Sequence, residues 1–414
     1  MIKESKRLTR RKFLGHSACG LASLGLGGMM SRVRGQSAPQ SGELVKGEPV
    51  RRVLGKTGIG LPVVSLGAMN AGGNDPLIRR ALDLGVRHVD TAFNYGLGRN
   101  EEMIGRVVKE MNLRDEVAIA TKIPLLPPTV TRQMDPAQVP AYFLKHVEGS
   151  LKRLQSDYID LLYFHDVQDV GELKHPGWME GMATAKKQGK ASFVGFSTHA
   201  NMAQCLRAAV EGRFYDVVLT SFNYAMGENS ELAAAMKKAA DAGLGLIAMK
   251  TQCKQPWYSS TEENPARREY AAKISHSALL KWVLQHDFIT TAVPGCQNFD
   301  ELEQDFAVAS DLNFTEEEKQ FLKDPEVVAG LRAVCQQCGS CRGTCASAVD
   351  VPSLVRAHMY AVSYRNAEQA LATLRDIPRE RGLERCWSCG ECAVRCRFSV
   401  PAAQRIAELR ALFA

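Results

Sequence analysis

Four polar residues in the first half of the chain could together move a proton onto or off an oxygen atom. A free tyrosine has a pKa of about 10 and is a poor acid at neutral pH. An ammonium group beside it favours the phenolate, and a carboxylate beside that ammonium keeps it charged. Tyr95, Lys122 and Asp90 would thus form a tuned proton donor. His165 could relay the proton or orient a carbonyl oxygen.

A second set of reactive side chains lies near the C-terminus, in two short cysteine-rich runs. Residues 335–345, "CQQCGSCRGTC", and 386–396, "CWSCGECAVRC", both have the spacing C-x2-C-x2-C-x3-C. This is the ligand run of a two-cluster ferredoxin, in which the fourth cysteine usually binds the other cluster. The runs therefore predict two 4Fe-4S clusters. The predicted ligand sets are Cys335, Cys338, Cys341 and Cys396 for one cluster, and Cys345, Cys386, Cys389 and Cys392 for the other.

Zinc binding and disulfide formation are two other possible uses of these cysteines. Zinc also suits sites of four cysteines, but zinc ribbons lack the third cysteine at this spacing. Disulfides are usual in exported proteins, yet the crowding of eight cysteines into two groups argues against them. A further alternative is that metal binding stabilises this part of the chain without carrying electrons.

These side chains need a scaffold, and the chain from residue 51 repeats a short apolar run, a polar turn and an amphipathic helical pattern. Such runs are typical of parallel strands buried on both faces. Their alternation with helices allows a doubly wound sheet or a closed (β/α)8 barrel, and eight runs favour the barrel. The predicted strands cover residues 63–69, 88–92, 117–123, 158–166, 191–198, 215–223, 244–250 and 290–295.

The four candidate catalytic residues lie at or just after the ends of the second, third and fourth predicted strands, where barrels of this kind carry their chemistry. Residues 51–62 are expected to form a small hairpin that plugs the barrel floor. Thr315 is expected to cap a helix that leads away from the barrel. The predicted division of the chain is a signal peptide (1–38), a linker (39–50), the α/β barrel (51–312) and a mostly helical ferredoxin-like domain (313–414).

Several stretches of the barrel region resemble the aldo-keto reductases. They include "VDTAFNYGLGRNEEMIG" (89–105), "ATKIP" (120–124), "DYIDLLYFHD" (157–166) and "VPGCQNFDELEQD" (293–305). The resemblance spans about residues 51–310 and includes all four positions of the family's tetrad. It implies that the tetrad reduces a carbonyl or oxidises an alcohol with a nicotinamide nucleotide. The tetrad positions are Asp90, Tyr95, Lys122 and His165.

The same resemblance implies a nucleotide site that departs from the family pattern. Thr198 replaces the common asparagine beside the nicotinamide amide, and Met249 stands near the usual stacking ring. Glu301 lies in the strip that usually binds the adenosine phosphate and would repel a 2'-phosphate, so the choice between NAD and NADP stays open. The candidate cofactor-binding residues are Ser197, Thr198, Asn223, Met249, Lys250, Gly295 and Gln304.

The N-terminal stretch "TRRKFL" (9–14) resembles a twin-arginine export signal. A basic start, an apolar middle and small residues near 35–38 make the pattern of a cleaved signal, and the apolar segment is too short to span a bilayer stably. Iron-sulfur clusters are built in the cytoplasm, so a protein that carries them must be exported in its folded state. The twin-arginine route accepts such folded cargo. The sequence therefore predicts a bacterial periplasmic protein whose signal is cleaved.

The charge distribution bears on partners. The net charge of +7 equals the balance within residues 1–38, so the remainder is neutral overall and offers no basic field to nucleic acid. The expected partners are a small carbonyl or alcohol substrate such as a sugar, an electron-transfer partner and the twin-arginine machinery. A second class of function also stays open, a redox or binding protein whose barrel does not turn over nucleotide.

Overall fold

The computed structural model describes residues 47–227, 230–253, 269, 272–332, 334–389 and 392–413. The predicted signal peptide and most of the predicted linker lie outside these residues. The barrel and the C-terminal helices belong to one structural unit. Among the described residues, no helix combines the length and the apolar character needed to cross a membrane.

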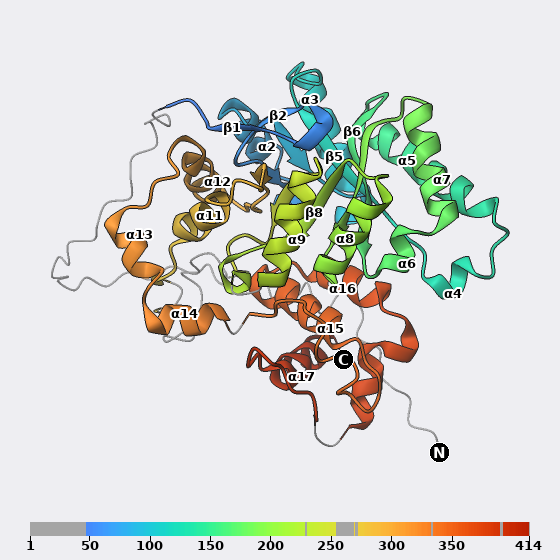
Figure 1. The fold of residues 1–414 in the computed structure, drawn as a ribbon, viewed down its shortest axis with the longest axis vertical. Helices are drawn as coiled ribbons and strands as arrows, with labels where there is room; N and C mark the ends of the chain where they lie inside the picture. The colour runs from blue at the N-terminus through green and yellow to red at the C-terminus, as the bar shows by residue number, and fades with distance from the viewer. Residues whose placement is uncertain are drawn as a thin grey trace, which may run out of the picture. The chain divides into compact units, whose positions relative to one another are not determined.

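Eight parallel strands form the barrel, and neighbours in the sheet are neighbours in the chain (Figure 1). Bridges from Val64 to Ala292 and from Gly67 to Gly295 join the last strand to the first. The predicted (β/α)8 fold is thus confirmed, and five of the eight strands are shorter than predicted. The strands are β3 (Leu66–Gly67), β4 (His88–Asp90), β5 (Ala118–Pro124), β6 (Ile159–Val167), β7 (Ala191–Thr198), β8 (Val217–Ser221), β9 (Gly245–Met249) and β10 (Thr291–Ala292).

Helices follow the strands, and several begin at a polar cap. The side chains of Asn74, Ser275 and Asn298 each accept a backbone N–H of the first turn, which stabilises the helix start. The barrel helices are α2 (Asp75–Asp83), α3 (Arg99–Glu110), α4 (Pro128–Thr131), α5 (Gln138–Leu154), α6 (Val170–Leu173), α7 (Pro176–Lys187), α8 (Met202–Gly212), α9 (Ser230–Asp241), α11 (His276–Leu284) and α12 (Phe299–Ala307).

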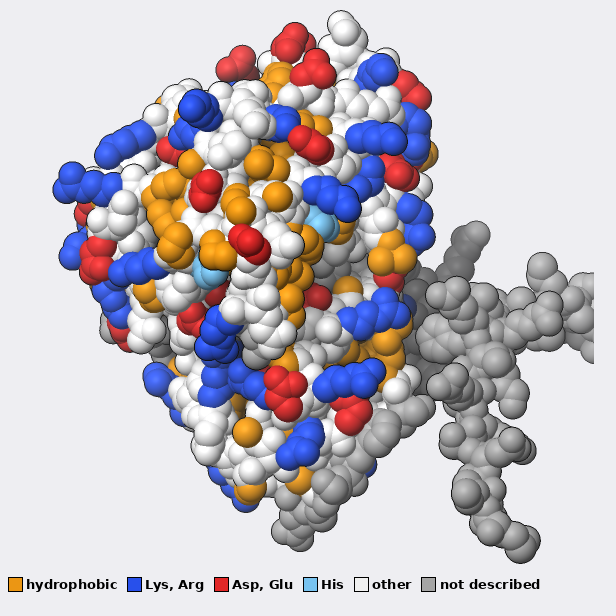
Figure 2. Space-filling model, turned by 90° about the vertical axis from the view of Figure 1, so that its right-hand side faces the viewer, with side chains coloured by type: hydrophobic (Ala, Val, Ile, Leu, Met, Phe, Trp, Pro, Cys, Tyr) orange, Lys and Arg blue, Asp and Glu red, His pale blue; other side chains and the backbone are white. Residues whose placement is uncertain are grey.

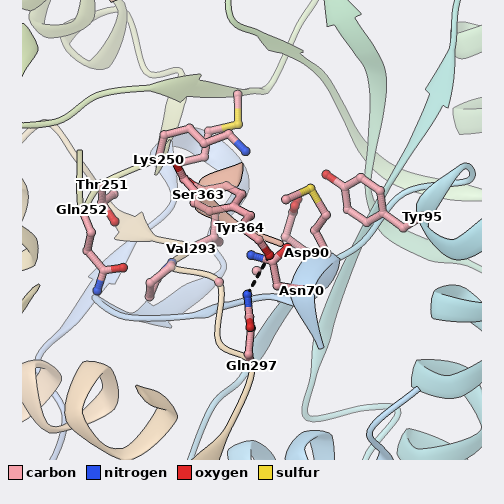
Figure 3. Close-up of a pocket in the computed structure, with 15 residues that line it drawn as sticks. Asn70, Asp90, Tyr95, Lys250, Thr251, Gln252, Val293, Gln297, Ser363 and Tyr364 are labelled. Carbon is pink, nitrogen blue, oxygen red and sulfur yellow. Dashed lines mark hydrogen bonds between the residues drawn. The ribbon is translucent and has the colours of Figure 1, made fainter. Parts of the chain in front are cut away.

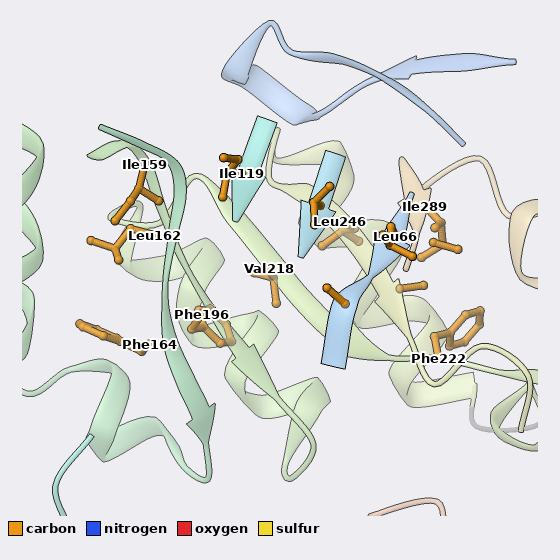
Figure 4. Packing of buried hydrophobic residues seen from close by; sticks show 14 of the residues in the cluster. Leu66, Ile119, Ile159, Leu162, Phe164, Phe196, Val218, Phe222, Leu246 and Ile289 are labelled. Atoms are coloured by element: carbon orange, nitrogen blue, oxygen red, sulfur yellow. The ribbon is translucent and has the colours of Figure 1, made fainter. Parts of the chain in front are cut away.

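Alternation along each strand divides the apolar core into two layers. Outward side chains such as Ile119, Leu162 and Phe196 pack under the helices (Figure 4). Inward side chains such as Leu161 and Leu219 fill the barrel itself. The interior is therefore solid, and polar side chains can face solvent only at its ends.

The N-terminal hairpin closes one end of the barrel. Strands β1 (Arg51–Val53) and β2 (Gly60–Pro62) pair antiparallel. Leu54 and Leu61 are buried against the inward side chains of the barrel strands, as expected for a floor plug. The opposite end, where the strands finish, stays available for a site.

The chain after the barrel first packs on the barrel instead of leading away from it. Helices α13 (Glu316–Phe321) and α14 (Pro325–Arg332) follow a capping box made by Thr315 and Glu318. Phe321 shares an apolar cluster with Leu279 of α11, and Lys281 forms a buried ion pair with Glu318. These contacts explain why the helix that begins after Thr315 packs on the barrel, and why the prediction that it leads away was wrong.

The cysteine-rich region has its own small core. Helices α15 (Val351–His358), α16 (Ala367–Asp376) and α17 (Ala402–Phe413) lie together in Figure 1, and a π-helical turn, η6 (Met359–Ser363), follows α15. Leu354 and Leu409 are fully buried in this core.

On the face of the molecule shown in Figure 2, Lys and Arg side chains are interspersed with Asp and Glu.

Candidate active site at the carboxyl end of the barrel

Three of the four candidate catalytic side chains contact one another. Lys122 Nζ lies 2.5 Å from Asp90 Oδ1 and 3.4 Å from the Tyr95 hydroxyl oxygen. It also donates to the carbonyl oxygen of Thr91 at 2.6 Å, so the three N–H donors of the ammonium are all directed. Asp90 and Lys122 are almost completely buried. The lysine therefore links the carboxylate to the phenol, as the sequence predicted.

Backbone hydrogen bonds hold the loop that carries the phenol. After β4, the N–H groups of Thr91 and Phe93 donate to carbonyls of β5, the second of them to that of Lys122. Tyr95 then begins a short turn, η3 (Tyr95–Gly98), in which Gly96 adopts a φ of +57°. A glycine accepts this left-handed conformation without strain. Tyr95 is thereby placed over the end of the neighbouring strand.

His165 joins this group through its ring. Its centroid lies 5.9 Å from that of Tyr95 in an edge-on arrangement. The pairing of β6 with β7 is irregular between Phe164 and Val167, and Asp166 has a φ of +56°. Irregularities of this kind often redirect a side chain beside an active site.

The water-poor surroundings set the protonation states. Desolvation raises the pKa of Tyr95 well above 10, with the charge of Asp90 adding to the rise. Desolvation lowers the pKa of His165 well below 6.5, and Lys122 contributes in the same direction. Desolvation also lowers the pKa of Lys122, which Asp90 opposes. The expected net acidification of the tyrosine is therefore not found, and Tyr95 keeps its proton near neutral pH beside a neutral histidine.

A pocket opens beside Asp90 and Tyr95 (Figure 3). Met249, Lys250 and Gly295 from the candidate cofactor set line it. Several other lining residues are not among the candidate site residues of the sequence analysis, because they come from turns, loops and the C-terminal region. These are Asn70, Thr251, Gln252, Gln297, Ser363 and Tyr364.

The other cofactor candidates lie outside this lining. The Ser197 hydroxyl accepts the N–H of Asp166 at 2.9 Å, and that of Thr198 donates to the carbonyls of Val167 and Ala200. Both hydroxyls are committed to backbone groups. Gln304 is exposed on α12.

Buried polar atoms near the pocket indicate where a ligand could bind. Among the described residues, Asp90 Oδ2, Asn223 Oδ1 and Thr251 Oγ1 are buried without a hydrogen-bond partner. The amide nitrogen of Asn223 is engaged, because it donates to the carbonyl of Lys250 at 3.0 Å. Buried polar atoms left unpaired are costly, so partners supplied by a polar ligand would stabilise this region.

The eight cysteines of the two runs form two groups that cross between the runs. The thiol of Cys341 interacts with those of its own run at 335 and 338 and with Cys396 of the second run. The thiol of Cys386 interacts with those at 389 and 392 and with Cys345 of the first run. These are the two predicted ligand sets, and four thiolates per group suit a 4Fe-4S cluster.

The surroundings of the two groups differ. Cys335, Cys341 and Cys396 of the first group and Cys345 and Cys386 of the second pack beside the small apolar core, whereas Cys389 and Cys392 of the second group are exposed. Among the described residues, no three His, Cys, Asp or Glu side chains converge on one point as a single ion would require. Solvent exposure changes the reduction potential of a cluster, so the two groups offer unequal sites.

A (β/α)8 barrel with polar side chains gathered where its strands end is the architecture of a large class of enzymes. Residues 59–273 match the aldo/keto reductase family, and residues 334–401 match a 4Fe-4S dicluster domain. The first match covers just over half of the 414 residues. The chain therefore belongs to the aldo/keto reductase family and carries a dicluster domain after its barrel.

Individual relatives agree with this assignment. The uncharacterized oxidoreductase YrpG of Bacillus subtilis is 30% identical over 214 residues, 47% of this chain and 64% of that protein. L-Glyceraldehyde 3-phosphate reductase of Escherichia coli is 32% identical over 170 residues, 37% of this chain and 46% of that protein. The chain thus spans less than two thirds of either relative.

A solved structure shows the same fold. An aldo-keto reductase from Bacillus halodurans in its holo form superposes with a TM-score of 0.54 at 19% identity. The match covers 67% of this chain and 96% of the other.

Proposed function

We propose that this protein is an exported oxidoreductase that transfers hydride between a nicotinamide nucleotide and a small carbonyl or alcohol. The observation that carries the proposal is the contact of Lys122 Nζ with both Asp90 Oδ1 and the Tyr95 hydroxyl at the edge of a pocket. A nicotinamide, when bound, supplies or accepts the hydride. Asp90, Tyr95 and Lys122 would supply or accept the proton that accompanies the hydride.

In the direction of reduction, the Tyr95 hydroxyl donates its proton to the carbonyl oxygen as hydride reaches the carbon. The products are the alcohol and the oxidised nucleotide. The ammonium of Lys122, 3.4 Å from the phenol oxygen, stabilises the phenolate that remains, and Asp90 holds that ammonium in place. In the direction of oxidation, the phenolate takes the hydroxyl proton back.

Met249, Lys250 and Gly295 would hold the nucleotide, since they line the pocket beside Tyr95. The unpaired Asn223 Oδ1 could accept a hydrogen bond from its amide or ribose groups, and the Thr251 hydroxyl could donate or accept one.

The cysteine groups would hold two 4Fe-4S clusters, each of which carries one electron. Together they would pass two electrons between the reductase site and an outside partner, which with one proton equal the hydride of one turnover. The exposed thiols of Cys389 and Cys392 put the second group at the surface, where a partner could approach. Scarcity of free nucleotide outside the cytoplasm leads us to propose that the nucleotide is loaded before export and retained. The mature protein would then act in the periplasm after cleavage of its twin-arginine signal.

The substrate class follows from the named relative and the pocket. One relative is a reductase of L-glyceraldehyde 3-phosphate, a small hydroxylated aldehyde that carries a phosphate. Neutral polar side chains at Asn70, Gln297 and Ser363 line the pocket here, and they suit the hydroxyl groups of a sugar or small aldehyde.

One set of contacts favours a second candidate function. The hydroxyls of Ser197 and Thr198 are bonded to backbone groups, and C-terminal residues enter the pocket lining. A redox or binding protein that does not turn over nucleotide would show both features.

A single titration separates the two functions. Anaerobically purified, cluster-loaded protein is titrated with NADH and NADPH while nucleotide fluorescence is followed, and then mixed with a panel of sugars and small aldehydes. Saturable binding of one nucleotide and its oxidation by a panel member support the enzyme. Protein that is fully loaded with clusters but binds neither nucleotide supports the second candidate.

A further inference from the structure

Residues of the dicluster region (334–401) line the same pocket as Tyr95. Ser363 and Tyr364, which end and follow the π-helical turn η6, are drawn among the barrel's own pocket residues in Figure 3. The side-chain nitrogen of Gln297 donates to the carbonyl oxygen of Tyr364 at 3.0 Å, the dashed line in that view. Asn366 donates to the side-chain oxygen of Asn70 at 3.3 Å. Isolated π-helical turns are frequent at functional sites.

Lys250 is bound to the same segment. Its ammonium lies 4.7 Å from the ring centroid of Tyr360 and 5.3 Å from that of Tyr364, within the range of a cation–π contact. The backbone of Lys250 has a φ of +58°, a conformation that a lysine seldom adopts. Met69 of the barrel packs against the apolar cluster that contains Tyr360. Barrel and dicluster residues therefore interleave around the pocket.

A buried ion pair anchors this segment. Arg356 of α15 donates from both terminal nitrogens to the two carboxylate oxygens of Asp166, at 2.7 and 2.6 Å. The side chain of Arg356 is 7% exposed and that of Asp166 23% exposed. Asp166 directly follows His165. A bidentate pair of this kind fixes orientation as well as distance.

A second ion pair between the two regions provides a natural comparison. Arg99 contacts Glu368 of α16 at 3.0 Å, but these side chains are 66% and 49% exposed. Exposed pairs are screened by water and contribute little to stability. Losing one partner of a buried pair leaves an uncompensated charge and is strongly destabilising. The anchoring is therefore assigned to Arg356 and Asp166.

We propose that the dicluster region completes the nucleotide and substrate pocket, with Ser363 and Tyr364 as pocket residues and the Arg356–Asp166 pair as the anchor that holds them there. This inference rests on the proposed function. It makes Tyr364 a residue that determines how tightly ligand is held, and Arg356 a positioning residue that acts through it. A nucleotide bound beneath this segment leaves only when the anchor opens, which gives the proposed retention a structural cause.

The test uses full-length, cluster-loaded protein and measures the dissociation rate of NADH or NADPH by stopped-flow fluorescence. R356Q is expected to speed dissociation and weaken affinity at least tenfold, which corresponds to about 1.4 kcal/mol. R356K should lie between R356Q and wild type, because an ammonium cannot make both parallel hydrogen bonds. E368Q, the matched control at the exposed pair, should stay within twofold of wild type. The cluster absorbance of each variant shows whether the dicluster region has folded.

Tyr364 is tested by two substitutions and by hydrogen exchange. Y364A should raise KM for the carbonyl substrate more than it lowers kcat, while Y364F, which keeps the ring over Lys250, should raise KM less than Y364A does. Bound nucleotide should slow amide exchange in the peptide that contains residues 359–364.

Three outcomes would overturn the inference. In the first, R356Q releases nucleotide no faster than E368Q, so the anchor has no role although the proposed function stands. In the second, R356Q binds nucleotide more tightly than wild type, so the segment blocks the pocket. In the third, neither wild type nor any variant binds either nucleotide, and the proposed function then fails as well.

Discussion

Lys122 Nζ lies 2.5 Å from Asp90 Oδ1, and the two side chains are only 2% and 6% exposed. A charge pair so far from water survives because each partner compensates the other, and the remaining lysine donors are directed to Thr91 and Tyr95. The pair is therefore both part of the candidate site and part of the barrel's stability.

Removing one partner of this pair is expected to destabilise the barrel. K122M leaves the Asp90 carboxylate buried without its cation, at a cost of about 3–5 kcal/mol. The melting temperature, followed by circular dichroism of cluster-loaded protein, should fall clearly. The double variant D90N/K122M should recover part of the loss because it buries no charge.

K237M is a matched control for that experiment. Lys237 pairs with Asp241 on the surface of α9, with side chains 62% and 64% exposed. Its loss should cost no more than about 1 kcal/mol. An equal drop for K122M and K237M would contradict the role given to the buried pair.

The phenol of Tyr95 is expected to be essential for proton transfer. Y95F should lower kcat by about 10²- to 10⁴-fold, the range that positioned acid catalysis contributes. Nucleotide affinity should change little, because the ring is retained. Steady-state kinetics with any substrate found in the panel, together with nucleotide titration, measures both. Unchanged turnover in Y95F would mean that another group delivers the proton.

The pH dependence of reduction follows from the same site. Desolvation raises the pKa of Tyr95 above 10, so the donor keeps its proton until pH exceeds that value and is lost above it. Desolvation lowers the pKa of His165 well below 6.5, so the histidine stays neutral through the neutral range. The rate of reduction at saturating substrate should be flat between about pH 6 and 9 when chemistry limits it. A step near pH 6.5 would contradict the lowered pKa of His165, because it would show that a group of the site changes its protonation state there.

Glu172 is expected to make stability depend on pH. Desolvation raises the pKa of its carboxyl from 4.5 to about 7 in the folded chain. Between these values the folded state binds a proton that the unfolded state has released, so this contribution to stability is present at low pH and is lost as pH rises through 7. E172Q, which stays neutral, should remove that slope from melting temperatures measured between pH 4.5 and 7.5. An unchanged slope would place the titrating group elsewhere.

The crossed cysteine groups make a distinctive prediction about iron content. C335A/C396A removes two ligands from one group, so about half of the iron should remain. C335A/C345A removes one ligand from each group, so both clusters should be damaged. Iron and sulfide analysis with electron paramagnetic resonance of anaerobic samples separates the two variants. The reverse ranking would show that each run binds its own cluster.

Export is expected to depend on the paired arginines. Replacing Arg10 and Arg11 by lysine keeps the charge of "TRRKFL" but removes the feature that resembles the twin-arginine signal. The variant should stay in the cytoplasm with its clusters intact, whereas wild type should reach the periplasm in a shortened form. Immunoblots of cell fractions measure both. Unaltered export of the variant would point to another route.

Local patterns were sufficient to predict the barrel and the catalytic contacts. Each buried strand is a short apolar run, and parallel strands in a closed barrel all end on one side, so Asp90, Lys122 and His165 had to finish near one another. The spacing of the cysteines within residues 335–345 and 386–396 likewise predicts two groups of four cysteines. Helix α13 was predicted from its cap, but its packing was not, since Phe321 finds its partners on a distant helix.

The sequence by itself thus determined which side chains are candidates for proton transfer and for cluster binding, because that choice follows from residue type and short-range spacing. Only the tertiary structure decided that Ser363 and Tyr364 line the pocket, and that Arg356 pairs with Asp166 across 190 residues of chain. It also decided the direction of the Tyr95 pKa shift, because desolvation depends on everything packed around a group and not on its nearest charged neighbour. Contacts between distant segments depend on how two separately folded surfaces fit, and no local pattern encodes that fit.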